Sequence, residues 1–255
     1  MVQSLNVSQT FSRAAASYDQ QAVVQNFVAR RLSSKILAQK GTSLGAILEV
    51  GCGTGILTPH LLPHCTHYVL SDFSHSILKV AMEKTQDERI LPLVLNAEYP
   101  CFSASFDLIV SNLALHWFQD PKGALTRLTA CLKPGGWLYF TALGNNSFHE
   151  WRTAHALEGA PSGVLDFIPF GQLKDWLPLS GNRAVEEEWI TTTPSNALEF
   201  LRDLKKIGAG LPQPGHRPLP HSTFKKVMKI YNMCPQTSYQ ILFASYQKPE
   251  KMREE

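Results

Sequence analysis

A short apolar strand that runs straight into a glycine-rich turn is the feature that most limits how this 255-residue chain can fold. Residues 48–55 read LEVGCGTG, which places glycines at Gly51, Gly53 and Gly55. Glycine lets the backbone curl tightly and lets a ligand approach main-chain atoms where a Cβ would stand in the way. The pattern therefore predicts a strand–turn–helix unit with a ligand outside the carboxyl end of the strand.

Apolar runs alternate with helical segments along the rest of the chain, which predicts βαβ crossovers and a mostly parallel sheet. Near-continuous apolar runs are typical of parallel strands that helices cover on both faces. A helix over 121–132 and an LKPGG turn are expected before the strand at 137–143. The expected strands are 46–50, 67–71, 90–95, 106–112, 137–143, 185–193 and 238–248, and the first long helix is expected over about 17–40.

Composition excludes several other classes of protein. Hydrophobic residues make up 44% of the chain and charged residues 18%, which excludes a disordered or fibrous chain. No apolar run reaches the roughly 18–20 residues of a membrane span, and the first 20 residues hold no apolar signal segment. Five scattered cysteines without a C-x-x-C pair predict a reducing, cytoplasmic setting and no metal site.

Charge is unevenly spread, although the net charge is only +3. Residues 1–43 carry a net +4 and residues 196–236 a net +5, whereas residues 44–195 carry −6. If the two basic segments meet in space, they predict an anionic partner. The alternative, that both are solvated helix faces, stays open on charge alone.

An acid before the glycines narrows the class of ligand. With Glu49 the pattern becomes E-x-G-x-G-x-G, whereas the dinucleotide fingerprint G-x-G-x-x-G would need glycine at Ile56. The pattern resembles motif I of the class I S-adenosylmethionine-dependent methyltransferases. This resemblance implies an α/β Rossmann-like sheet with an antiparallel last strand, and S-adenosylmethionine as cofactor, with S-adenosylhomocysteine as its product.

Further cofactor contacts follow the next strands. Asp72 follows the second strand, where a carboxylate can accept from both ribose hydroxyls, although it could also cap the next helix. Asn96 stands after the third strand, where such enzymes often carry an acid for the adenine amino group, and Glu98 is an alternative acceptor. The expected cofactor residues are Glu49, Gly51, Gly53, Gly55, Asp72, Phe73, Asn96, Ala97, Asn112 and Leu113.

The segment SNLALHW at 111–117 follows the fourth strand. In the resembling enzymes, the segment at this position forms the floor of the site beside the transferable methyl group. His116 and Trp117 are candidates there, and a packed, polar-tipped core pair is the alternative. The segment lacks the [D/N]-P-P-[Y/F/W] motif of amino-group methyltransferases. Cys101 follows the third strand rather than the fourth, which argues against a cytosine-5 methyltransferase.

Two outer segments point to a particular family. FSRAAASYDQQA at 11–22 and ALEFLRDLKKIGA at 197–209 resemble the entry helix and the inserted segment of the malonyl-[acyl-carrier-protein] O-methyltransferases of biotin synthesis. Asn96 and the proline-rich stretch 210–220 depart from that family's pattern. The resemblance implies one domain over 1–255, divided into a helical arm 1–43, a cofactor core 44–195, a basic helical lid 196–236 inserted between the last two strands, and a last strand with tail 237–255.

The resemblance implies methyl transfer to the free carboxylate of a malonyl group on acyl carrier protein. Tyr18 and Trp117 are the expected residues that orient the substrate. Another small-molecule O- or C-methyltransferase and a nucleic-acid-binding protein are the alternatives; the lid has few aromatic residues and the pI of 8.6 is modest, so no nucleic-acid partner is expected. The expected substrate or carrier contacts are Arg13, Arg152, Arg202, Lys205, Lys206, Lys225 and Lys226.

Overall fold

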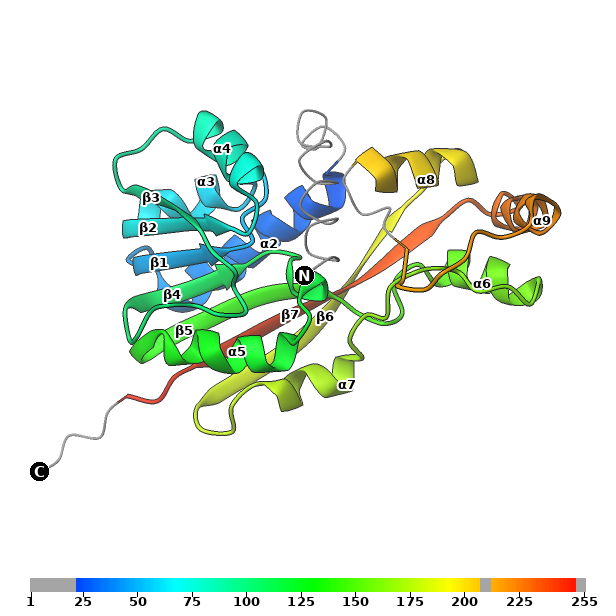
Figure 1. Ribbon diagram of the computed structural model, residues 1–255. Helices are drawn as coiled ribbons and strands as arrows, with labels where there is room; N and C mark the ends of the chain where they lie inside the picture. The colour runs from blue at the N-terminus through cyan, green and yellow to red at the C-terminus, as the bar shows by residue number, and fades with distance from the viewer. Residues whose placement is uncertain (1–21, 207–211, 251–255) are drawn as a thin grey trace, which may run out of the picture.

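The protein is built on one seven-stranded sheet, shown in a computed structural model that describes residues 22–206 and 212–250 (Figure 1). The strand order is β3-β2-β1-β4-β5-β7-β6, and β7 runs antiparallel to both of its neighbours while the other pairs are parallel. The predicted Rossmann-like sheet with an antiparallel last strand is confirmed. The strands are β1 Gly45–Val50, β2 Cys65–Asp72, β3 Ile90–Val94, β4 Phe106–Ser111, β5 Leu132–Leu143, β6 Asn182–Thr192 and β7 Thr237–Gln247.

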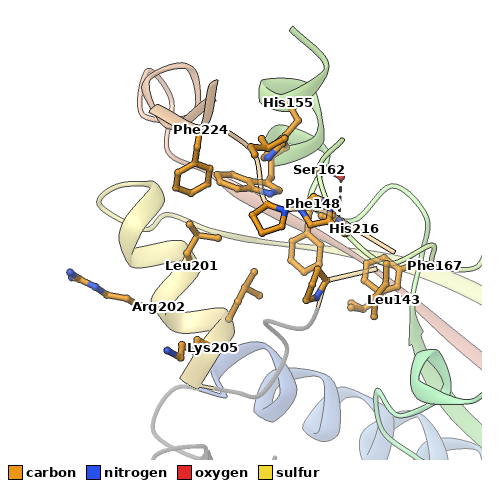
Figure 2. A pocket seen from close by; sticks show the side chains of 18 of the residues that line it. Leu143, Phe148, His155, Ser162, Phe167, Leu201, Arg202, Lys205, His216 and Phe224 are labelled. Atoms are coloured by element: carbon orange, nitrogen blue, oxygen red, sulfur yellow. Dashed lines mark hydrogen bonds between the residues drawn. The ribbon is translucent and has the colours of Figure 1, made fainter. Parts of the chain in front are cut away.

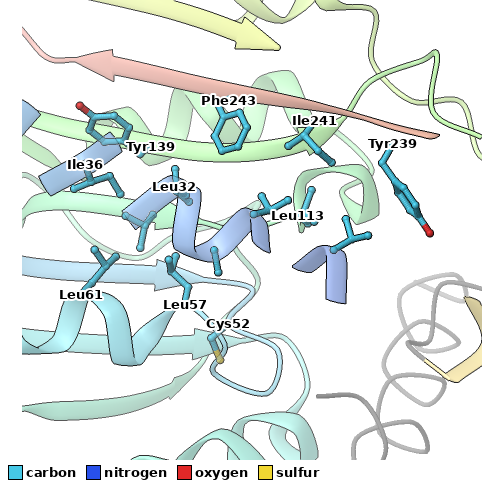
Figure 3. Close-up of a cluster of buried hydrophobic side chains, with 14 of the residues drawn as sticks. Leu32, Ile36, Cys52, Leu57, Leu61, Leu113, Tyr139, Tyr239, Ile241 and Phe243 are labelled. Carbon is cyan, nitrogen blue, oxygen red and sulfur yellow. The ribbon is translucent and has the colours of Figure 1, made fainter. Parts of the chain in front are cut away.

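Helices cover both faces of the sheet, as the near-continuous apolar strands predicted. Successive residues of β1 divide between the faces: Ile47 belongs to one core and Leu48 to the other. Figure 3 shows Leu32 and Leu61, which belong to the same core as Ile47. None of the helices in the described ranges is long and apolar enough to cross a membrane. The helices outside the insertion are α2 Val23–Lys40, α3 Thr58–Leu61, η1 Leu62–His64, α4 His75–Lys84, η2 Leu115–Trp117, α5 Pro121–Ala130, α6 His149–Leu157, α7 Phe170–Leu173 and η3 Lys174–Trp176.

The expected turn before the fifth strand is wrong. Helix α5 ends at Ala130, and β5 already begins at Leu132, whose Cα pairs with that of Phe106. The sequence LKPGG therefore lies inside the strand. The pairing register between β4 and β5 shifts between Phe106 and Leu108 to accommodate it. Burial of Leu132, which is 0% exposed, holds this residue in the sheet despite the proline and glycines that follow.

Two helices are inserted between β6 and β7, α8 Ala197–Lys206 and α9 His221–Tyr231 (Figure 1). Asn196 caps the start of α8, since its Oδ1 accepts the Glu199 N–H at 3.1 Å. The end of α9 holds the start of α8, because Asn232 Oδ1 accepts the Ala197 N–H at 2.7 Å. Helix α6 packs against α9, so α6, α8 and α9 gather at one end of the sheet.

Helix α9 lies within the predicted helical lid 196–236, but its own bounds were not predicted, although its sequence carries a signal for them. Phe224, Val227 and Tyr231 follow one another at helical spacing, and all three pack into the core that Figure 3 samples. The last of the prolines that precede the helix, Pro220, stands at its N-terminus.

Candidate active site

The glycine turn after β1 places its three glycines in the left-handed region, at φ values of 64°, 56° and 82° for Gly51, Gly53 and Gly55. A Cβ on Gly51 would lie 2.7 Å from the Ala114 Cβ, and one on Gly55 would lie 3.3 Å from the Ala81 Cβ. A Cβ on Gly53 would meet no protein atom within 4 Å. Gly51 and Gly55 therefore permit close packing, whereas Gly53 opens toward ligand space.

A cavity of about 390 Å³ lies outside the carboxyl ends of β1, β2 and β4. Gly55 is the one expected cofactor residue that does not line it, because this glycine packs against α4 instead. The cavity is also lined by three residues that the sequence did not predict as cofactor contacts: Tyr99, Phe118 and Gln25. The expected residues that line it are Glu49, Gly51, Gly53, Asp72, Phe73, Asn96, Ala97, Asn112, Leu113 and Trp117.

Asp72 is fixed by the backbone on both sides of its carboxylate. Its Oδ2 accepts the Gly53 N–H at 3.0 Å, and its Oδ1 accepts the Ser74 N–H at 2.8 Å. Burial raises the pKa of Asp72, and the backbone donors oppose that shift. Ser74, not Asp72, is the N-cap of α4. Each carboxylate oxygen keeps a lone pair, so Asp72 can also accept from a pair of vicinal hydroxyls.

Glu49 lies at the floor of the same cavity, 1% exposed. Its Oε2 accepts the Tyr68 hydroxyl at 2.6 Å and the Thr58 hydroxyl at 2.8 Å. Burial raises the pKa of Glu49 to about 7, against the opposing effect of these two donors. Sequence reasoning missed both partners; a tyrosine inside a buried strand, which needs a hydrogen-bond partner, was the available signal.

Asn96 closes a local turn, because its Oδ1 accepts the Glu98 N–H at 3.0 Å. The same oxygen has a second lone pair, which can face an exocyclic amino group in the cavity. The side chain of Glu98 is engaged elsewhere, since its Oε1 accepts the Asp120 N–H at 2.6 Å. Asn96 is therefore better placed than Glu98 to contact an adenine ring.

Asn112 is bonded within the protein at both ends of its amide. Its Nδ2 donates to the Gln25 backbone oxygen at 3.2 Å, and its Oδ1 accepts the Thr141 hydroxyl at 2.9 Å. The Thr141 oxygen also accepts the Leu113 N–H at 2.9 Å, which holds Leu113 at a φ of 53°. The network ties α2 to the loop after β4, so it shapes the cavity wall.

A second cavity, of about 1030 Å³, lies between the end of the sheet and helices α6, α8 and α9 (Figure 2). Trp117 lines both cavities, so the two meet at this residue. Much of the wall is aromatic or aliphatic, and Figure 2 shows Phe148, Phe167, Leu201 and Phe224 around it. Three exposed cations of α8 also line it: Arg202, Lys205 and Lys206.

Three other basic candidates, Arg152, Lys225 and Lys226, do not line this cavity. Arg152 donates to the backbone oxygens of Ser147 and Leu165, so its guanidinium braces the loop that carries the wall. Lys225 and Lys226 lie exposed on α9, and Lys226 pairs with Glu158 at 3.4 Å. The expectations for Tyr18 and Arg13 lie outside the described residues, which hold no cluster of three or more His, Cys, Asp or Glu suited to a metal ion.

Comparisons with known proteins identify the family of this chain. A methyltransferase-domain family model matches residues 48–140. An O-methyltransferase for malonyl-[acyl-carrier protein] from Magnetococcus marinus is 34% identical over 230 residues, which cover 88% of this chain and 84% of that protein. The biotin biosynthesis bifunctional protein BioCD of Bordetella avium is 33% identical over 96% of this chain and 52% of its own length.

A solved structure shares this fold. The N-methyltransferase NodS of Bradyrhizobium japonicum, in complex with S-adenosylhomocysteine, has a TM-score of 0.57 at 18% identity, covering 96% of this chain and all of that one. The fold, the glycine turn and the matched domain define a class I S-adenosylmethionine-dependent methyltransferase. Within that class, the chain belongs to the malonyl-[acyl-carrier protein] O-methyltransferase family.

Proposed function

We propose that this enzyme transfers the methyl group of S-adenosylmethionine to the free carboxylate of malonyl-[acyl-carrier protein] in biotin synthesis. One carboxylate oxygen forms the new bond to the methyl carbon as the carbon–sulfur bond breaks. The electron pair of that bond stays on sulfur, which loses its positive charge. No proton is transferred, and the products are the malonyl methyl ester, which primes assembly of the pimeloyl chain, and S-adenosylhomocysteine.

The observation that supports this proposal best is the meeting of two unlike cavities at Trp117. The smaller cavity carries the glycine turn and the Asp72 carboxylate. The larger one combines an aromatic wall with three cations at its rim. A cofactor in the first and a thioester-linked acid entering the second would meet at the shared residue.

The residues of the smaller cavity fit an adenosyl group. Asp72 offers two carboxylate oxygens that are held in place by backbone donors, which suits the ribose hydroxyls. Phe73, 44% exposed, and Phe118 offer apolar surface for the adenine ring. The open space over Gly53 lets the ligand approach the backbone. When bound, S-adenosylmethionine supplies an electrophilic methyl group.

The chain needs no general base for this reaction, because a carboxylic acid is ionised at neutral pH and its carboxylate is the nucleophile. The task of the protein is to hold the reacting atoms in line and to exclude water. Phe148, Trp151 and Phe167 are each less than 9% exposed and form the dry part of the wall. The network around Asn112 and Thr141 fixes the loop that lies between the two cavities.

The carrier would dock on the basic helices of the insertion. Arg202, Lys205 and Lys206 line the mouth of the larger cavity, and Lys225 stands exposed on α9. An acyl carrier protein is acidic, so these cations would steer its approach. All five cysteines are free thiols, which fits a cytoplasmic enzyme that works beside such a carrier.

Mass spectrometry of methyl transfer tests the proposal. Malonyl-carrier protein, malonyl-coenzyme A and free malonate would each be incubated with enzyme and S-adenosylmethionine, with RNA as a competitor. Formation of the malonyl methyl ester on the carrier, faster than on free malonate and insensitive to RNA, is the expected result. Methylation of free malonate at an equal rate would favour a small-molecule methyltransferase instead, and inhibition by RNA would favour a nucleic-acid function.

A further inference from the structure

His116 stands where the two cavities meet. It precedes Trp117 in the short helix η2 after β4, and its ring lies 4.9 Å from that of Trp117, centroid to centroid. The ring of Phe167 meets it edge-on at 5.7 Å. His116 lines the larger cavity, next to the residue that lines both. An imidazole packed between two aromatic rings is held in a defined orientation toward that space.

The two nitrogens of the His116 ring have different surroundings. Nδ1 is sealed from solvent and has no hydrogen-bond partner among the described residues. A neutral imidazole carries one N–H and one bare nitrogen. A sealed N–H without an acceptor is the costlier arrangement, so the bare nitrogen belongs at Nδ1 and the proton at Nε2. The Nε2–H group is then the polar edge that the ring offers to the cavity.

The charge of the ring is set by its burial, which lowers the pKa of His116 to about 4. The ring is therefore neutral at pH 7. A neutral donor suits a carboxylate nucleophile, because it orients the anion while drawing less electron density from it than a cation would. Strong cationic binding would stabilise the ground state most, since the carboxylate loses its charge during transfer.

We infer that His116 is a substrate-binding residue, which donates its Nε2–H to one oxygen of the substrate carboxylate and leaves the other oxygen free to attack the methyl group. This inference rests on the proposed function. It also divides the work within the larger cavity: the exposed cations of α8 meet the carrier at the mouth, and the neutral imidazole selects a carboxylate-terminated acyl group inside.

Binding without turnover tests this role. Enzyme saturated with S-adenosylhomocysteine would be titrated calorimetrically with malonyl-pantetheine and with acetyl-pantetheine, which has the same arm but no carboxylate. Wild type should prefer the malonyl thioester. In H116L that preference should fall by roughly 10–100-fold, the effect of losing one hydrogen bond to a charged group, while the affinity for acetyl-pantetheine stays unchanged.

A matched pair of variants separates the donor from the bulk of the ring. H116Q carries an amide N–H near the position of Nε2 and should keep the preference within about threefold, whereas H116N, whose amide is closer to Nδ1, should lose it. The exposed His67 on β2 supplies the control H67L, which should behave like wild type. The Gln and Asn pair decides the question even if H116L does not fold, and S-adenosylhomocysteine affinity reports whether each variant keeps its cofactor site.

Three results would overturn the inference. Equal losses for the malonyl and acetyl thioesters would show that His116 only shapes the wall. A preference that survives in both H116L and H116N would show that another group reads the carboxylate. If wild type itself shows no preference, the proposed function fails together with the inference, and this failure is recognised without any variant.

Discussion

Asp72 Oδ2 accepts the backbone N–H of Gly53 at 3.0 Å, so the carboxylate after the second strand holds the glycine turn after the first. The two residues are 19 positions apart and meet because β1 and β2 are parallel neighbours whose carboxyl ends share one edge of the sheet. This bond places the Asp72 carboxylate, which we propose as the ribose acceptor, beside the open backbone of Gly53.

Removal of this carboxylate is the first test. Asp72→Ala should weaken S-adenosylmethionine binding roughly 10–100-fold, on the order of 1.5–3 kcal/mol for hydrogen bonds to a charged acceptor. It should also lower the free energy of unfolding, because the Gly53 and Ser74 N–H groups lose their acceptor. Calorimetry measures the affinity, with Asp175→Ala, exposed on η3, as the control. Wild-type affinity in Asp72→Ala would remove the ribose assignment.

Asn96 offers a gain-of-affinity test. Asn96→Asp keeps an oxygen for the Glu98 N–H and adds a second, charged acceptor, so it should bind S-adenosylmethionine as well as wild type or up to about tenfold better. An S-adenosylhomocysteine analogue with an oxo group in place of the adenine amino group should lose this advantage, because it no longer donates there. A weaker cofactor complex in Asn96→Asp would mean that the amide NH₂ is the group in use.

Because of Glu49, the free energy of unfolding should fall as pH rises from about 4.5 toward 7. Its pKa is about 7 in the folded state against 4.5 for the free group, so the folded state holds the proton more tightly. The stability that this proton supplies is present below about pH 4.5 and is lost as pH rises toward 7, by on the order of 3 kcal/mol. Urea unfolding of wild type and Glu49→Gln at pH 5 and pH 8 measures the effect.

The neutral amide in Glu49→Gln should remove this slope. The variant should match wild type at pH 5 and exceed its stability at pH 8, while its cofactor affinity falls because a cavity-lining carboxylate is lost. Parallel pH dependences in the two proteins would show that Glu49 is not the titrating group.

The basic insertion should recognise the acidic carrier protein through the positive charges of its lysine side chains. A double reversal, Lys205→Glu with Lys225→Glu, should lower kcat/KM for malonyl-carrier protein while the affinity for cofactor is kept. Turnover of malonyl-coenzyme A should respond less, since it lacks the acidic protein surface. Raised salt should act on wild type as the reversal does, because the Debye length falls from about 10 Å at 0.1 M to about 3 Å at 1 M.

The matched control for that comparison reverses Lys122 and Lys174, two exposed lysines on α5 and η3. It changes the net charge by the same amount on elements that are not part of the insertion. An equal fall in the control would reduce the effect to overall charge, and an equal fall for both substrates would mean that the insertion does not recognise the carrier.

The sequence alone predicted the sheet and, through the resemblance of its glycine motif, the class of cofactor, and most of the residues that it placed around the cofactor line one cavity. Each of these depends on local signals: apolar runs fix the strands, glycines fix the turn, and the parallel order of β1, β2 and β4 brings Glu49, Asp72 and Asn112 to one edge. The resemblance over 197–209 likewise predicted an insertion between the last two strands, and α8 lies there.

Only the tertiary structure decided how each side chain is used. Asn112 is occupied by the Gln25 backbone oxygen and the Thr141 hydroxyl, and Gly55 packs against Ala81, although the sequence placed both residues among the cofactor contacts. The sealed Nδ1 of His116 depends on neighbours that no local pattern names. Hydrogen-bond partners and burial are set by residues far apart in the chain, so they become known when the strands and helices are packed together.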